Sequence, residues 1–323
     1  MILDRRSALK FLGLSSAAAA FAGALKAEGL QAAPNASAGL PFALTTPVHI
    51  EEAALRVRNL DIMAAYYRDV LGLREIRKTE DGIVLGAGSE ALLHLIHRPD
   101  ANQESQRSAG LFHIAYLMPS REDLARWLVH AAMLRVYIDG FADHNVSEAI
   151  YLTDPEGNGI EVYSDRPRER WTWQGDLVTM GTEPLDIDDI LRLADTSHDT
   201  YVSAPQSLRI GHIHLRVGEI AKARAFYQDR LGLASTRGDR PNAAFLASGG
   251  YHHHIAVNTW NSEGASLRDS RDTGLDWFSL RVMETSLHAE QKRRFAESGA
   301  VQAVDGGFET TDPWGTKVRL LAS

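Results

Sequence analysis

The sequence predicts an α+β fold of four βαβββ modules, in which mixed β-sheets form cups flanked by helices. Two repeated patterns support this prediction. Segment 57–73 matches segment 217–233 without gaps at a spacing of 160 residues, and both segments end in Leu-Gly-Leu. An Asp-Pro-x-Gly turn then closes each half of the chain, at 154–157 and at 312–315. Repeats in a constant register indicate duplicated structural units.

Each repeated unit reads as a strand, an amphipathic helix and three further strands. A second such unit follows in each half and begins with the apolar stretches 110–117 and 274–280. We therefore expect one domain over residues 48–164, which holds modules one and two, and another over 208–323, which holds modules three and four. Residues 165–207 between them are expected to form a linker with one short helix.

The first 38 residues resemble an export signal of the twin-arginine (Tat) type. Arg5 and Arg6 precede an alanine-rich apolar stretch, and the Ala-Ser-Ala sequence at 36–38 fits a cleavage site. We therefore leave residues 1–38 out of the fold and expect an exported, periplasmic protein. A leader that is not cleaved would instead leave the protein in the cytoplasm.

Composition excludes several classes of partner. The net charge of −8 offers no surplus of cations for phosphate contacts, so nucleic acid is not expected as a partner. After the leader there is no apolar run long enough to span a membrane, so no membrane-embedded domain is expected. Because the chain has no cysteine, any metal must be held by histidine and carboxylate. The oligomeric state stays open, a homo-oligomer included.

The stretch 151–163 predicts a β-hairpin that carries a candidate metal ligand. Its centre, Asp-Pro-Glu-Gly-Asn-Gly, has the residues of a tight turn. On the returning strand, Ile160 and Val162 point to one face and Glu161 to the other. A carboxylate alone on that face is either exposed to solvent or a ligand. Which of the two applies to Glu161 depends on the residues around it.

The four modules with these signatures resemble the vicinal oxygen chelate superfamily, whose fold is shared by glyoxalases and bleomycin resistance proteins. The resemblance implies that two paired modules form a cup around a divalent metal. Ligands would come from the first strand of each paired module and from the last strand of one. The first-strand positions in modules one to four are Glu52, His113, His212 and Trp277. The last-strand positions in modules two and four are Glu161 and Arg319.

Pairing module two with module three gives a complete ligand set. The cup then contains His113, His212 and Glu161, two histidines and one carboxylate, which is the facial triad of non-haem Fe(II) oxygenases. A single carboxylate leaves a ferrous centre with a net positive charge that can hold a catecholate while O2 binds beside it. We therefore expect Fe(II) as the cofactor, with Mn(II) as the alternative.

Three consecutive histidines, at 252–254, are candidates for proton transfer. If the stretch is a strand, His252 and His254 share a face and His253 takes the other. His254 lies as far beyond Gly232 as His94 lies beyond Gly72, so both are expected to face a cup. We therefore favour His254 as the catalytic acid–base group and keep His253 as the alternative, because a register can slip by one residue.

A closer resemblance links several stretches to the catechol 2,3-dioxygenase branch of the type I extradiol dioxygenases. The stretches are 109–115, 143–151, 211–217 and 251–254. The resemblance implies extradiol cleavage of catechol or a substituted catechol, so a small aromatic diol and O2 are the expected partners. It also implies that Tyr151 hydrogen-bonds the substrate or oxygen and that His144 lies near the substrate.

Two other functions remain as alternatives. Glu52, His94, His113 and Glu161 could form a metal site within the first half, as in glyoxalase-type isomerases that abstract a proton beside a carbonyl. A non-catalytic member of the superfamily would instead bind a ligand without consuming oxygen.

Overall fold

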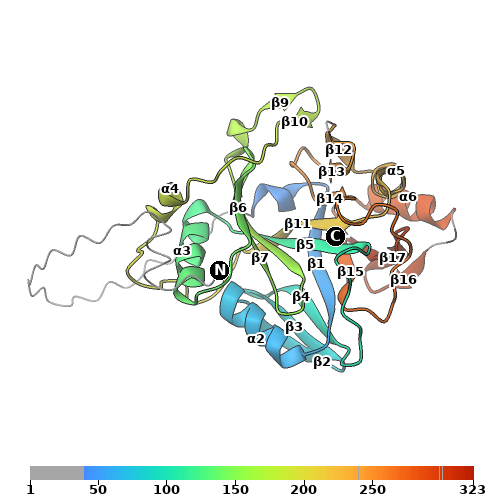
Figure 1. The fold of residues 1–323 in the computed structure, drawn as a ribbon. Coiled ribbons are helices and arrows are strands. Elements are labelled where there is room, and N and C mark those ends of the chain that lie inside the picture. Colours follow the sequence, from blue (N-terminus) through green and yellow to red (C-terminus); the bar gives the residue numbers. More distant parts are fainter. Residues whose placement is uncertain (1–39, 239, 298, 300) are drawn as a thin grey trace, which may run out of the picture.

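The computed structural model describes residues 40–238, 240–297, 299 and 301–323 (Figure 1). The export signal expected at residues 1–38 therefore lies outside the described residues. Among the helices of the described part, none combines the length and the apolar character needed to cross a membrane.

Four βαβββ modules follow one another along the chain, as expected. Module one contains β1 (Val48–Val57), α2 (Leu60–Leu71), β2 (Arg74–Thr79), β3 (Gly82–Ala87) and β4 (Glu90–His97). Module two contains β5 (Gly110–Leu117), α3 (Arg121–Met133), β6 (Gly140–Asp143), β7 (Ser147–Thr153) and β8 (Gly159–Asp165). The predicted hairpin is formed by β7 and β8, with Glu161 on the returning strand.

The second half repeats this order. Module three contains β11 (Arg209–Arg216), α5 (Ile220–Arg224) with the π-helical turn η3 (Ala225–Arg230), β12 (Ala234–Arg237), β13 (Ala243–Ala247) and β14 (Ile255–Asn258). Module four contains β15 (Gly274–Val282), α6 (Thr285–Ala296), β16 (Gln302–Val304), β17 (Gly307–Thr311) and β18 (Lys317–Ala322).

Each large sheet combines one module from each half of the chain. Within the described residues, one eight-stranded sheet runs β12-β13-β14-β11-β5-β8-β7-β6 and the other runs β16-β17-β18-β15-β1-β4-β3-β2. The antiparallel pairs β5–β11 and β1–β15 join the halves at the middle of the two sheets. Modules two and three therefore share a sheet, as the predicted ligand set requires.

The repeated sequence motifs hold the two modules of each half together. In the first half, the buried Tyr67 hydroxyl on α2 donates to Asp154 Oδ2 at 2.9 Å, while Asp154 Oδ1 accepts the backbone N–H of Asn158 in its own turn. In the second half, Tyr227 donates to Asp312 in the same way, also at 2.9 Å. The repetition of the tyrosine and Asp-Pro motifs in both halves thus has a structural reason, because the tyrosine of one module binds the aspartate of the next.

The segment 165–207 is more ordered than a simple linker. It contains the short helix expected from the sequence, α4 (Ile187–Leu191), and also the turn η2 (Arg168–Arg170). A two-stranded ribbon, β9 (Trp173–Gln174) with β10 (Leu177–Val178), extends at one side of the molecule (Figure 1). The first tryptophan of the segment, Trp171, precedes this ribbon and is buried against Phe42 of the turn η1 (Phe42–Thr45).

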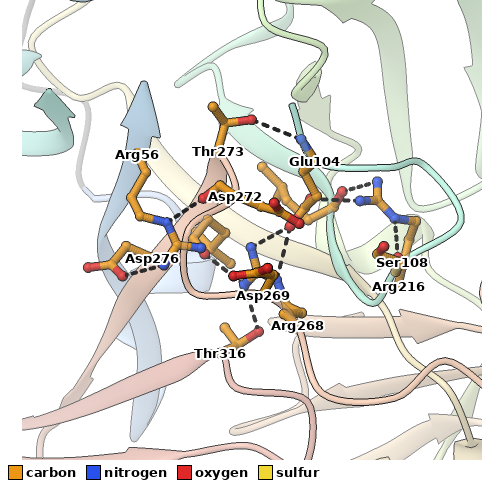
Figure 2. A network of polar contacts seen from close by, with 12 residues as sticks. Arg56, Glu104, Ser108, Arg216, Arg268, Asp269, Asp272, Thr273, Asp276 and Thr316 are labelled. Atoms are coloured by element: carbon orange, nitrogen blue, oxygen red, sulfur yellow. Dashed lines mark hydrogen bonds and ion pairs between the residues drawn. The ribbon is translucent and has the colours of Figure 1, made fainter. Parts of the chain in front are cut away.

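A buried carboxylate joins the loops that connect the modules (Figure 2). Glu104, between modules one and two, accepts from Arg216 at 2.7 Å and from Arg268 at 2.9 Å. Both arginine side chains are almost fully buried. Gly110 and Gly274, at the starts of β5 and β15, have positive φ, and a Cβ atom at either would lie within 3 Å of this carboxylate. Glycine at both positions lets the two central strands begin beside Glu104.

We predict that Glu104→Ala destabilises the protein by about 3–5 kcal/mol, because two buried guanidinium groups lose their shared carboxylate. Denaturation of the wild-type and variant proteins with guanidinium chloride measures this difference. Glu290→Ala, which removes the ion pairs of Glu290 with Arg293 and Arg294 on the surface of α6, is the control and should change the stability little. Equal effects of the two substitutions would contradict the role given to Glu104.

Candidate metal centre

The sheet of modules two and three places four side chains of interest on one face. Across the strands, Tyr151 of β7 pairs with Glu161 of β8, Glu161 with Ala115 of β5, and Ala115 with His212 of β11. Paired residues point to the same side of a sheet, so these side chains share a face. The small Ala115 separates Glu161 from His212, and His113 lies two residues before it on the same face. The strand pairing therefore concentrates the ligands above the middle of the sheet.

The three predicted ligands converge on one point. Glu161 Oε2 lies 3.0 Å from His113 Nε2 and 3.2 Å from His212 Nε2, and the two Nε2 atoms are 3.3 Å apart. All three side chains are buried. Among the described residues, they form a group of ligand atoms within 4.8 Å of one another.

This geometry fits a divalent metal. Bonds of about 2.1 Å at right angles would separate neighbouring ligand atoms by roughly 3 Å. The three measured separations are close to that value, and they involve one carboxylate oxygen and one nitrogen from each ring. Such a set occupies one side of an octahedral ion and leaves the other positions for ligands from the cavity.

Electrostatics favour the ligand forms of these groups. Burial opposes ionisation of Glu161, but His212 and His113 together hold the pKa of this carboxyl well below its usual range. Burial lowers the pKa of His212 to about 4, an effect that Glu161 partly offsets. Burial, reinforced by Glu161, raises the pKa of the Tyr151 phenol well above its usual value. At neutral pH the site therefore offers a carboxylate, a neutral His212 and a protonated phenol.

The ligands line a cavity of about 540 Å³. Its walls are largely apolar and include the side chains of Phe112, Phe141, Phe245, Trp260 and Met180. Arg237 and Arg240 also line it. Since an apolar cavity of about 150 Å³ can hold benzene, this space accommodates a substituted single ring.

Tyr151 and His144 form a pair at the cavity wall. His144 Nδ1 lies 2.8 Å from the backbone carbonyl of Gly181, and its Nε2 lies 2.6 Å from the Tyr151 hydroxyl. A carbonyl only accepts, so Nδ1 carries the proton that is donated to it. For the neutral ring, Nε2 then accepts the hydrogen bond from Tyr151. This arrangement turns the lone pairs of the Tyr151 oxygen toward other partners.

The two histidines considered for proton transfer have different environments. His253 lines the cavity, and its ring centroid lies 4.2 Å from that of the candidate ligand His212. His254 is fully buried elsewhere. Its Nε2 lies 3.0 Å from the carbonyl oxygen of Ala43, and its Nδ1 accepts the backbone N–H of Ser248 at 3.2 Å. The expectation that His254 faces the cavity is therefore wrong, and the alternative, His253, is the histidine that lines it.

The orientation of His254 follows from the register of this stretch. Residues 251–254 precede β14 and are not part of the strand, so alternation does not apply to them. His94 pairs with Ala54, whereas Ala256 pairs with His214, the counterpart of Ala54 in module three. The position equivalent to His94 is thus Ala256, two residues beyond His254.

The alternative site within the first half is not assembled. Glu52 and His94 contact each other, but they lie in the sheet of modules one and four, whereas His113 and Glu161 lie in the other sheet. In this second cup, Arg319 occupies the position equivalent to Glu161 and covers the ring of Trp277 at 3.8 Å. A guanidinium cannot ligate a cation.

Several residues of the cavity could not be recognised in the sequence. Met180, Gly181 and Thr182, from the segment expected to be a linker, form part of the wall. Trp260 lies in the loop after β14. His214, two residues after His212 on β11, also lines the cavity and contacts Asn258 at 3.0 Å. The tautomer of His144 depends on Gly181, for which no motif exists.

We predict that His254 makes the stability of the metal-free protein depend on pH. Burial lowers its pKa from 6.5 to about 3. The unfolded chain therefore binds a proton that the folded chain excludes, and the free energy of unfolding falls as the pH drops from about 6.5 to about 3. One such proton gives a slope of about 1.4 kcal/mol per pH unit. Denaturation between pH 7 and pH 4 should show a shallower slope for His254→Gln.

His198→Gln is the control, since the His198 side chain is exposed. It should keep the wild-type slope. Identical slopes for His254→Gln and the wild-type protein would show that His254 is not held neutral by burial.

Comparisons with known proteins agree with this architecture. Residues 48–162 and 209–267 match the family described as the glyoxalase/bleomycin resistance protein/dioxygenase superfamily. The chain is 36% identical over 276 residues to a catechol-2,3-dioxygenase of Bacillus subtilis, a match that covers 82% of this chain and 94% of that protein.

Solved structures show the same fold at low sequence identity. A putative dioxygenase from Bacillus subtilis is 13% identical with a TM-score of 0.56, and the match covers 86% of this chain and 85% of that one. Glyoxalase I from Zea mays is 17% identical with a TM-score of 0.54, covering 87% of this chain and 94% of that one. From its sequence matches and its four modules, the chain belongs to the glyoxalase/bleomycin resistance protein/dioxygenase superfamily.

Proposed function

We propose that this protein is a metal-dependent dioxygenase that cleaves the ring of catechol or a substituted catechol beside the diol, with O2 as the second substrate. The observation that carries the proposal is the convergence of His113, Glu161 and His212 in a cavity with aromatic walls. The 36% identical relative named catechol-2,3-dioxygenase supports the same reaction.

We assign Fe(II) to the three ligands, and the same donors would also accept Mn(II). A ferrous ion held there would supply coordination positions for the two diol oxygens and for O2 on one centre. Because both reactants would be held together, the reaction would gain the advantage of proximity.

The surrounding side chains have separate tasks. Phe112, Phe245 and Trp260 would hold the ring and exclude water. The Tyr151 hydroxyl donates to His144, so its oxygen can accept a hydrogen bond from a substrate hydroxyl. His253, whose ring lies beside that of His212, would take a proton from the diol and return it later as a general acid.

Export through the signal expected at residues 1–38 remains part of the proposal. The substrate would then be met outside the cytoplasm. Comparing the cell fractions for the full-length protein and for a twin-lysine variant of Arg5 and Arg6 tests this expectation.

We predict that His113→Ala, Glu161→Ala and His212→Ala each abolish metal binding and oxygen uptake, because each removes one of the three ligands. The measurements are metal content after anaerobic loading with Fe(II), and oxygen consumption with catechol and substituted catechols. A ring-cleavage product should appear in the visible absorption spectrum. Glu52→Ala, in the other sheet, is the control and should retain both properties. Loss of metal in Glu52→Ala alone would contradict the proposed site.

We predict that His253→Gln lowers kcat by about 10²- to 10⁴-fold while the metal content stays at the wild-type level, since the general acid–base group is lost but the three ligands remain. The neighbouring His254→Gln variant should keep kcat close to the wild-type value. Steady-state oxygen consumption measures both. A loss of kcat in His254→Gln but not in His253→Gln would assign the acid–base role to His254.

A further inference from the structure

A chain of three side chains leads away from the cavity through His253. His253 Nδ1 lies 2.8 Å from His252 Nδ1, and His252 Nε2 lies 2.9 Å from Asp165 Oδ1. His252 is fully buried, and the Asp165 side chain is 18% exposed. His253 is the member that lines the cavity. The carboxylate is therefore connected to the cavity through two imidazole rings.

If both imidazole rings are neutral, their hydrogen-bond partners determine which nitrogen of each ring carries the proton. A carboxylate only accepts, so His252 Nε2 carries the proton that it donates to Asp165. In the neutral His252 ring, Nδ1 then has the lone pair. The facing nitrogen, His253 Nδ1, must donate to it and so carries the proton of that ring. For neutral His253, this leaves Nε2 without a proton.

The acceptor role of Asp165 has further support. The Tyr251 hydroxyl also donates to Asp165 Oδ1, at 3.3 Å, and lies 2.7 Å from the Tyr163 hydroxyl. Asp165 ends β8, four residues beyond the ligand Glu161, so the same strand carries both carboxylates. The backbone of His252 is held as well, because its carbonyl accepts from the Thr236 hydroxyl.

We propose that Asp165 is a positioning residue that acts through His252 to keep a lone pair on Nε2 of His253. That lone pair is the acceptor for a substrate hydroxyl in the cavity. This inference rests on the proposed function for the role of His253, but the proton positions are a property of the metal-free protein. Asp165 does not have to contact the substrate, because it acts by setting the tautomer of His253.

The proton positions are measured directly in the full-length, metal-free protein labelled with ¹⁵N-histidine. Two-bond ¹H–¹⁵N spectra distinguish protonated from unprotonated ring nitrogens, and the spectrum of His253→Gln identifies the signals of His253. We expect a proton on Nδ1 and none on Nε2. A proton on Nε2 of wild-type His253 would overturn the inference.

Substitution of Asp165 tests the coupling. In Asp165→Asn, the side-chain amide can donate to His252 Nε2 and reverse both tautomers, which moves the proton of His253 to Nε2. We predict that this change appears in the spectrum and that kcat for the Fe(II)-loaded protein falls about ten- to a thousandfold, with a much smaller change in KM. Asp165→Glu, which retains a carboxylate, should restore the wild-type tautomer and part of kcat.

Asp199→Asn is the matched control. Asp199 pairs with His130 at 2.7 Å, so the variant makes the same change in another aspartate–histidine pair. It should leave the His253 signals and kcat unchanged. An Asp165→Asn protein with wild-type tautomers and wild-type kcat would overturn the inference. Expected tautomers without oxygen uptake by the wild-type protein would support the inference and contradict the proposed function.

Discussion

The antiparallel pairing of β5 with β11 is the constraint on which the candidate site depends. His113 and His212 are 99 positions apart in the sequence and belong to different halves of the chain. The strand register places them on one face, and β8 adds Glu161 from the other side of β5. Glu104 holds the ends of the central strands through two buried arginines. The candidate metal ligands are thus positioned by the main-chain hydrogen bonds of a sheet rather than by loops.

Two kinds of contact join the four modules. Within each half, a tyrosine from the first helix binds the aspartate of the second module's turn, as in Tyr67 with Asp154. Between the halves, the central strands pair and complete both sheets. The segment after β8 then returns across the cup and contributes Gly181, whose carbonyl orients His144. A stretch that looks like a connection in the sequence therefore forms part of the cavity.

The fold and the convergence of the three candidate ligands were accessible from the sequence because both depend on patterns. The repeat gave the modules, strand alternation separated Glu161 from its neighbours, and equivalent positions identified His113 and His212. Strand alternation could not predict which of His253 and His254 faces the cavity, because residues 251–254 lie outside a strand. The contact between Asp165 and His252 joins a strand end to a loop 87 residues later, and sequence periodicity does not predict contacts of this kind.

The cup of modules one and four shows what fusion of the halves permits. If two identical half-length chains associated in this way, every substitution would appear in both cups, and a cation such as Arg319 could not replace a ligand in one without removing it from the other. In a single chain the two cups diverge independently. One cup can then accumulate substitutions that the other does not share, as Arg319 illustrates, which stacks on Trp277 and pairs with Glu309.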